Sequence, residues 1–105
     1  MLYMMMQKGA NNTFYVKVGV TRNSVKSRYS QYKTHNPCAF LRSSCAGVNA
    51  AENSCHKTLS KIGERISGTE WFIVSEEVYT TLYEQGMRYF YPKHSPIYFH
   101  DKAVI

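Results

Sequence analysis

Two apolar segments separated by a short polar stretch open the sequence, and they constrain the fold more than any other feature. Residues 2–6 read LYMMM, an apolar run that predicts a strand buried on both faces. In residues 14–20, FYVKVGV, apolar side chains alternate with others, which is the period of a strand with one face toward a core. Residues 9–12, GANN, are typical of a turn. The sequence therefore predicts a β-hairpin at the start of the chain.

The alternation in the second strand also predicts where Lys17 lies. It falls on the face opposite to the valines, so its ammonium group is expected to be exposed. Gly19 shares that face and would leave room for a ligand or another backbone. A salt bridge within the first half is excluded because residues 1–51 contain no acidic side chain, whereas a partner from the second half stays open.

Caps and apolar spacing predict the remaining elements. The pattern favours a helix over residues 23–33, a third strand over 39–48 and a second helix over 49–63. A turn and a short extended piece follow at residues 68–74, and Ser75 is placed to cap a third helix. The expected fold is α+β, with a small three-stranded antiparallel sheet in the order hairpin, helix, strand, helix, helix.

The length and the hydropathy of the chain indicate its organisation. A chain of 105 residues can form one domain with a modest core, which we expect over about residues 2–90. The aromatic tail, residues 91–105, is expected to pack back on that core. No apolar run approaches the roughly 20 residues of a membrane helix, and residues 2–6 lack the flanks of a signal peptide. We therefore expect a cytoplasmic protein without a membrane segment, inside a host cell if the chain is viral.

Charge is distributed unevenly between the two halves of the chain. Residues 1–51 carry seven Lys and Arg and no Asp or Glu, whereas residues 52–105 carry six basic and seven acidic residues. Unneutralised positive charge over a whole half is typical of a surface that binds a polyanion, most simply a nucleic-acid backbone. A basic surface that only aids solubility is the alternative, and it explains the complete absence of acids poorly.

Three cysteines and one histidine raise the question of a zinc site. Cys38, Cys45, Cys55 and His56 lack the close cysteine pairs that structural zinc sites use. An odd number of cysteines without paired spacing fits reduced thiols in a cytosol. We therefore predict that the cysteines are small buried hydrophobic residues and that no zinc is bound.

A set of motifs in a fixed order resembles the GIY-YIG nuclease superfamily, and within it the small domains common in phages and viruses. The set consists of Tyr3, the stretch Lys17-Val18-Gly19-Val20-Thr21, Arg28, Glu52 and the stretch Gly68-Thr69-Glu70-Trp71-Phe72. The first family motif falls on residues 1–3 and keeps only the tyrosine. The second falls on residues 17–19, keeps the glycine and has lysine in place of tyrosine. The resemblance covers about residues 2–90.

The resemblance implies a metal-dependent endonuclease and assigns a role to each residue. Glu52 would hold Mg²⁺ or Mn²⁺, and Arg28 would bind the scissile phosphate. Tyr3 would orient or deprotonate the attacking water, and Lys17 would add positive charge at the phosphate or lower the pKa of Tyr3. His56, four residues after Glu52, could contact the metal or carry a proton.

Each role has a structural alternative. Asn49-x-x-Glu52 is a capping-box pattern, so Glu52 could instead satisfy backbone N–H groups at a helix start. Tyr3 could be a core aromatic, Arg28 a solvated helix residue and His56 an ordinary surface histidine.

The sequence thus supports two functions. The first is hydrolysis of phosphodiester bonds in DNA, with RNA left open as the substrate. The second is a binding module on the same fold, whose catalytic set has decayed and which contacts nucleic acid or a host defence protein. A protein partner or a homo-oligomer stays open in either case. The residues expected to contact nucleic acid are Lys17, Gly19, Thr21, Arg22, Lys26, Arg28 and Lys33.

Overall fold

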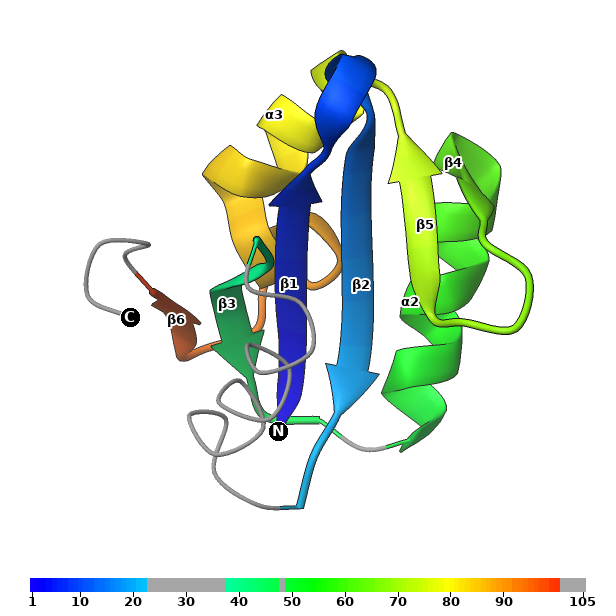
Figure 1. Cartoon of the computed structure of the whole chain (residues 1–105). Coiled ribbons are helices and arrows are strands. Elements are labelled where there is room, and N and C mark those ends of the chain that lie inside the picture. The colour runs from blue at the N-terminus through cyan, green and yellow to red at the C-terminus, as the bar shows by residue number, and fades with distance from the viewer. Residues whose placement is uncertain (23–37, 48, 101–105) are drawn as a thin grey trace.

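A six-stranded antiparallel sheet forms the centre of the domain in the computed structural model, which describes residues 1–22, 38–47 and 49–100 (Figure 1). The strands are β1 (Leu2–Lys8), β2 (Phe14–Val20), β3 (Phe40–Cys45), β4 (Gly63–Arg65), β5 (Trp71–Val74) and β6 (Ile97–Phe99). Their order across the sheet is β4-β5-β2-β1-β3-β6. Two helices, α2 (Asn49–Ile62) and α3 (Glu76–Gln85), and two short 3-10 turns, η1 (Ala10–Asn12) and η2 (Gly86–Tyr89), complete the described elements.

The α+β class and the hairpin are confirmed, but the prediction of three strands is wrong. β1 and β2 pair from Leu2 opposite Val20 to Lys8 opposite Phe14. The short extended piece predicted within residues 68–74 is confirmed as β5, whereas β4 and β6 were not predicted and have three residues each, too few for a period-2 pattern to be recognised. The predicted helix over residues 23–33 lies outside the described residues.

The turn of the hairpin and the start of α3 each follow from the conformational preferences of a few residues. Asn11 and Asn12 have φ angles of 58° and 57°, a left-handed conformation that asparagine adopts more readily than most residues. The side chain of Ser75 accepts a hydrogen bond from the Val78 amide at 3.1 Å, so the predicted cap of α3 is confirmed.

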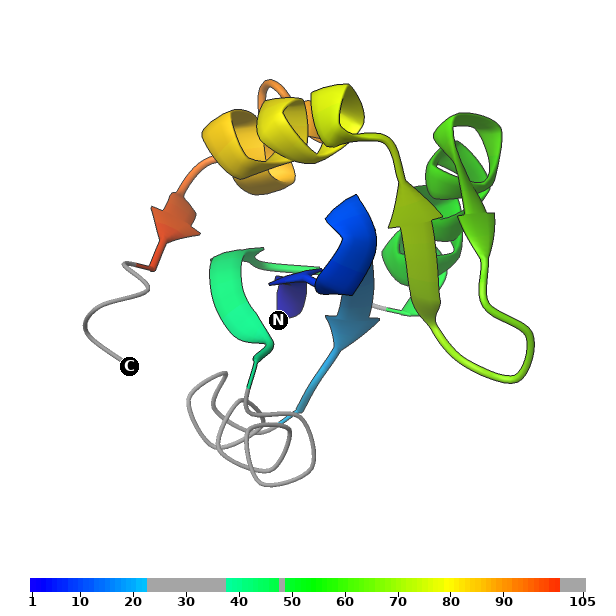
Figure 2. The same cartoon turned by 45° about the horizontal axis from the view of Figure 1, so that its top comes forward.

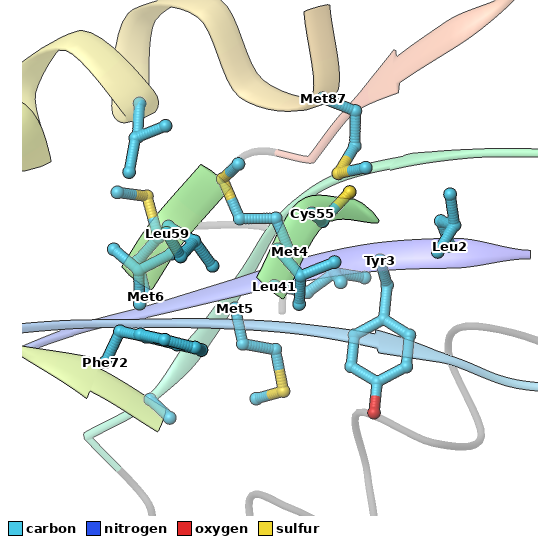
Figure 3. Packing of buried hydrophobic residues seen from close by; sticks show 14 of the residues in the cluster. Leu2, Tyr3, Met4, Met5, Met6, Leu41, Cys55, Leu59, Phe72 and Met87 are labelled. Atoms are coloured by element: carbon cyan, nitrogen blue, oxygen red, sulfur yellow. The ribbon is translucent and has the colours of Figure 1, made fainter. Parts of the chain in front are cut away.

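β1 is buried on both faces, as its uninterrupted apolar sequence predicts. Leu2 and Met4 point to one face, and Tyr3 and Met5 point to the other (Figure 3). On the face of Met4 lies α3, which runs across the sheet (Figure 2) and places Tyr79 5.0 Å from the ring of Phe14. On the opposite face, β1 and β2 bring Tyr3 beside Gly19.

Gly19 is buried because the phenol ring of Tyr3 lies directly over it. A Cβ atom added at Gly19 would lie 2.5 Å from Tyr3 Oη and 2.7 Å from Tyr3 Cζ. The space that the sequence analysis reserved for a ligand or a backbone is therefore filled by a side chain of the neighbouring strand.

The tail packs back on the domain in part. β6 pairs with β3, and the His100 amide donates to the Arg42 carbonyl oxygen at 2.9 Å. Tyr98 and Phe99 nevertheless remain 49% and 39% exposed. None of the described helices is long and apolar enough to span a membrane.

The cysteine prediction holds for two of the three thiols. Cys45 and Cys55 are buried, and Cys38 is exposed, so the prediction is wrong for Cys38. Burial raises the pKa of Cys45, and it raises the pKa of Cys55 to about 11.

We expect Gly19→Ala to lower the free energy of unfolding by about 1–3 kcal/mol, because the added methyl group overpacks the site against Tyr3. The loss should shrink when Tyr3→Leu is introduced as well, since leucine lacks the distal ring atoms that the methyl group would meet. Urea unfolding of the two single variants and the double variant measures this coupling. Equal losses in both backgrounds would show that Tyr3 is not the obstacle.

Thiol labelling of the native protein with a disulfide reagent at pH 8 should show one fast thiol, Cys38. Cys45 and Cys55 should react only after denaturation, because they are buried and their raised pKa values leave little thiolate. Cys38→Ser is the control and should remove the fast phase. A second fast thiol in the native protein would contradict the burial of Cys45 and Cys55.

Candidate functional site

The end of β2 extends past β5, and the candidate site forms at this overhang. The pairing of β2 with β5 ends at Lys17 opposite Trp71, so residues 18–20 have no described strand beside them on that edge. The end of β2, the beginning of β5 and the first turns of α2 lie near one another at the same end of the domain (Figure 1). Backbone groups at such an edge require other hydrogen-bond partners.

α2 supplies these partners from two side chains one helical turn apart. His56 Nε2 donates to the Val18 carbonyl oxygen at 2.7 Å. The backbone amide of Val20 donates to the Glu52 carboxylate. Side chains four residues apart lie on the same face of a helix, and both of these side chains bind β2.

His56 is held in a defined orientation. Its bond to Val18 requires a hydrogen on Nε2, and its ring lies 5.7 Å from the ring of Phe72 at an interplanar angle of 47°. These contacts leave Nδ1 as the nitrogen with which His56 would bind or carry a proton. The predicted catalytic role of His56 stays a prediction.

Lys17 is buried, and the prediction that it is exposed is wrong. It is only 5% exposed, and its Nζ lies 3.1 Å from Glu70 Oε2. Glu70 directly precedes Trp71, the residue opposite Lys17 in the β2–β5 register. The strand period placed Lys17 on the correct face, but it does not show what lies over that face. The counter-charge comes from the second half of the chain, as the sequence analysis left open, and it is Glu70.

The side chains of Glu52 and Glu70 interact directly. Burial raises the pKa of Glu52, and the charge of Glu70 and a hydrogen bond between the two carboxyl groups raise it further. His56 and the Val20 amide act in the opposite direction and lower it. Lys17, Glu70 and Glu52 therefore form one chain of polar contacts from the face of the sheet to the start of α2.

The capping-box alternative for Glu52 involves the side chain of residue 49, and the structure describes only the backbone of that residue. What the structure does show is that the Glu52 carboxylate binds an amide of β2. This contact joins α2 to the sheet, and it leaves open whether Glu52 has a chemical role as well.

Tyr3 lies beside the same three residues of β2. It is 2% exposed, as the core interpretation predicts. Its phenol ring covers Gly19, the residue between the two backbone groups that His56 and Glu52 bind. Three of the predicted site residues thus converge on residues 18–20, although they come from β1 and α2.

The residues predicted to contact nucleic acid differ in their exposure to solvent. Gly19 is covered by Tyr3, and Thr21 is buried, with its amide donating to the Met1 carbonyl oxygen at 2.9 Å. Arg22 is exposed. Lys26, Arg28 and Lys33 lie outside the described residues.

The donor set suits a hard cation better than zinc. Glu52 and Glu70 offer carboxylate oxygens, and Mg²⁺ binds through one or two carboxylates with water and substrate phosphate in its other positions. Within residues 1–22, 38–47 and 49–100, no group of three or more His, Cys, Asp or Glu side chains could hold a metal ion. Cys55, one of the residues considered for zinc, donates from its thiol to Tyr91 Oη at 3.7 Å.

Glu70 is the site residue that the sequence analysis missed. It was noticed only as part of the stretch Gly68-Thr69-Glu70-Trp71-Phe72 and was given no role. Predicting β5 as the sheet neighbour of β2 would have placed Glu70 near Lys17. The four residues of β5 give too short a pattern to predict that pairing.

Comparison with known proteins identifies the family. No curated protein and no solved structure matches the chain. The family model of the T5orf172 domain matches residues 1–85, which include Tyr3, Lys17, Glu52, His56 and Glu70. Because this match covers most of the chain, the protein belongs to the T5orf172 domain family, a family of phage-type nuclease-like domains.

Proposed function

We propose that this domain is a metal-dependent endonuclease of GIY-YIG type that hydrolyses phosphodiester bonds of DNA. Its family is associated with nuclease-like and DNA-binding functions. The observation that carries the finer proposal is the convergence of Tyr3, Glu52 and His56 on residues 18–20 of β2.

Glu52 would hold Mg²⁺ or Mn²⁺. Its carboxylate is partly desolvated and repelled by Glu70, and both effects favour a cation beside it. A bound divalent ion would lower the pKa of a water molecule and neutralise charge on the phosphoryl oxygens.

The other residues would position the substrate and the water. Arg28 would bind the scissile phosphate through its planar guanidinium group. Tyr3 would orient the attacking water through its hydroxyl group, and His56 would accept or carry a proton on Nδ1. A direct contact between Lys17 and phosphate is not part of this proposal, because the Lys17 ammonium group is buried and paired with Glu70.

A binding module without catalysis is the second candidate function. The observation that favours it is that Glu52 and His56 both bind the backbone of β2, which gives each a structural role sufficient to explain its position. Such a module would still bind nucleic acid through its basic half, or contact a host defence protein.

A cleavage assay separates the two functions. With Mg²⁺ or Mn²⁺, the wild-type protein should cut plasmid or single-stranded DNA, and chelator should abolish the cut. Glu52→Gln should lower the rate on the order of 100-fold or more, because the amide is a poor metal ligand. Glu77→Gln is the matched control, since Glu77 is an exposed glutamate in the first turn of α3, and it should cleave normally. If neither wild type nor Glu52→Gln cuts DNA that both bind, the binding module is the correct function.

DNA binding should be sensitive to salt and should depend on the first half of the chain. Its basic residues other than the buried Lys17 would release several counterions, so affinity should fall roughly tenfold or more between low and physiological salt. Arg22→Gln should weaken binding and reduce the salt slope, whereas Lys93→Gln should change neither, although both residues are exposed. Fluorescence anisotropy with a labelled duplex measures this, and equal affinity at both salts would contradict a contact to the DNA backbone.

A further inference from the structure

The pair of Lys17 and Glu70 has a feature that an ordinary surface salt bridge lacks. Lys17 emerges from the middle of β2, and its side chain is 6% exposed, whereas the side chain of Glu70 is 39% exposed. Burying an ammonium group is costly unless it is paired, and the Glu70 carboxylate is an anion directly beside it. Lys17 therefore fixes the position of the Glu70 carboxylate more strongly than a solvated lysine would.

The loop that carries Glu70 is fixed as well. The Ile66 amide donates to the Trp71 carbonyl oxygen at 2.9 Å, and Thr69 Oγ1 accepts from the Trp71 amide at 3.1 Å. Gly68, with φ of 78°, makes the turn in a conformation that other residues rarely adopt. The backbone of Glu70 is thus anchored on both sides, and its side chain is anchored by Lys17.

The Glu70 carboxyl group in turn interacts with the carboxyl group of Glu52. Glu52 is also bound by the Val20 amide and lies near His56, so several described groups restrict its carboxylate. A free glutamate side chain samples several rotamers, and confining it before a ligand binds removes part of the entropic cost of binding.

We propose that Lys17 and Glu70 are positioning residues, and that Lys17 acts through Glu70 to hold the Glu52 carboxylate in the orientation in which Glu52 binds a divalent cation. The inference rests on the proposed function for the identity of the ligand, but the positioning itself can be measured without it. It assigns Lys17 a role in the site that requires no contact with substrate.

The variant Lys17→Met distinguishes positioning from simple electrostatics. Removing a positive charge near a cation site should tighten cation binding if only charge matters. Loss of positioning should instead weaken it by about tenfold or more, the effect that partners of metal ligands usually have. Mn²⁺ affinity is read from the paramagnetic broadening of the amide NMR signals of Val20 and His56.

We expect weaker Mn²⁺ binding for Lys17→Met and for Glu70→Gln than for the wild type. Lys17→Arg keeps the positive charge and should bind Mn²⁺ more tightly than Lys17→Met does. Glu64→Gln, which alters an exposed carboxylate on the neighbouring strand β4, is the control and should bind as the wild type does. Unchanged or tighter binding by Lys17→Met overturns the proposal. If Lys17→Met or Glu70→Gln does not fold, the double variant Lys17→Met/Glu70→Gln removes both charges of the pair and is tested in their place.

A second measurement needs no metal. Three-bond scalar couplings of the Glu52 methylene protons should report a single rotamer in the wild type and averaged rotamers in Lys17→Met and Glu70→Gln. If the wild type binds no Mn²⁺ but these couplings change as expected, the proposed metal-dependent function fails while the positioning stands. Couplings that are the same in all three proteins overturn the positioning, whatever the metal does.

Discussion

The last residues of β2 extend beyond the end of its neighbour β5. Their backbone N–H and C=O groups on that edge therefore need hydrogen-bond partners other than a described strand. Two side chains of α2 meet this requirement. With His56 on the Val18 carbonyl and Glu52 on the Val20 amide, the helix serves as the edge partner of the sheet over this short stretch. The same contacts bring two ionisable side chains of α2 to the strand that carries Lys17, so one backbone constraint assembles most of the site.

A second constraint comes from the cost of burying a charge. Lys17 lies on a face of β2 that is covered, and its ammonium group is compensated by Glu70. Glu70 is available because a short loop returns the chain directly into β5, beside Lys17 in the sheet register. The electrostatics of the site and the topology of the sheet are therefore coupled, since a shift of β5 along β2 would separate the ion pair and move Glu70 away from Glu52.

Much of the first half of the fold could be predicted from the sequence. The uninterrupted apolar run of β1 and the alternating pattern of β2 are long enough to be read, and Ser75 marks a helix start through a bond to an amide three residues away. The family resemblance and the spacing of His56 from Glu52 named Tyr3, Glu52 and His56, and the structure places all three beside residues 18–20, while their catalytic roles stay predictions. The strands β4 and β6 and the pairing of β5 with β2 could not be predicted, because strands of three or four residues owe their stability to the neighbours they pair with.

The sequence by itself determined which faces of the hairpin are apolar, where the two described helices begin and that the first half of the chain carries basic residues but no acidic ones. These properties depend on side-chain period and composition, which are local. Only the tertiary structure decided that Lys17 is buried, that Tyr3 fills the space at Gly19 and that Glu70 belongs to the site. Each of these depends on a contact between segments far apart in the chain or on neighbouring strands. A strand period states which side chains share a face, but the segments that cover that face are set by how the whole chain packs.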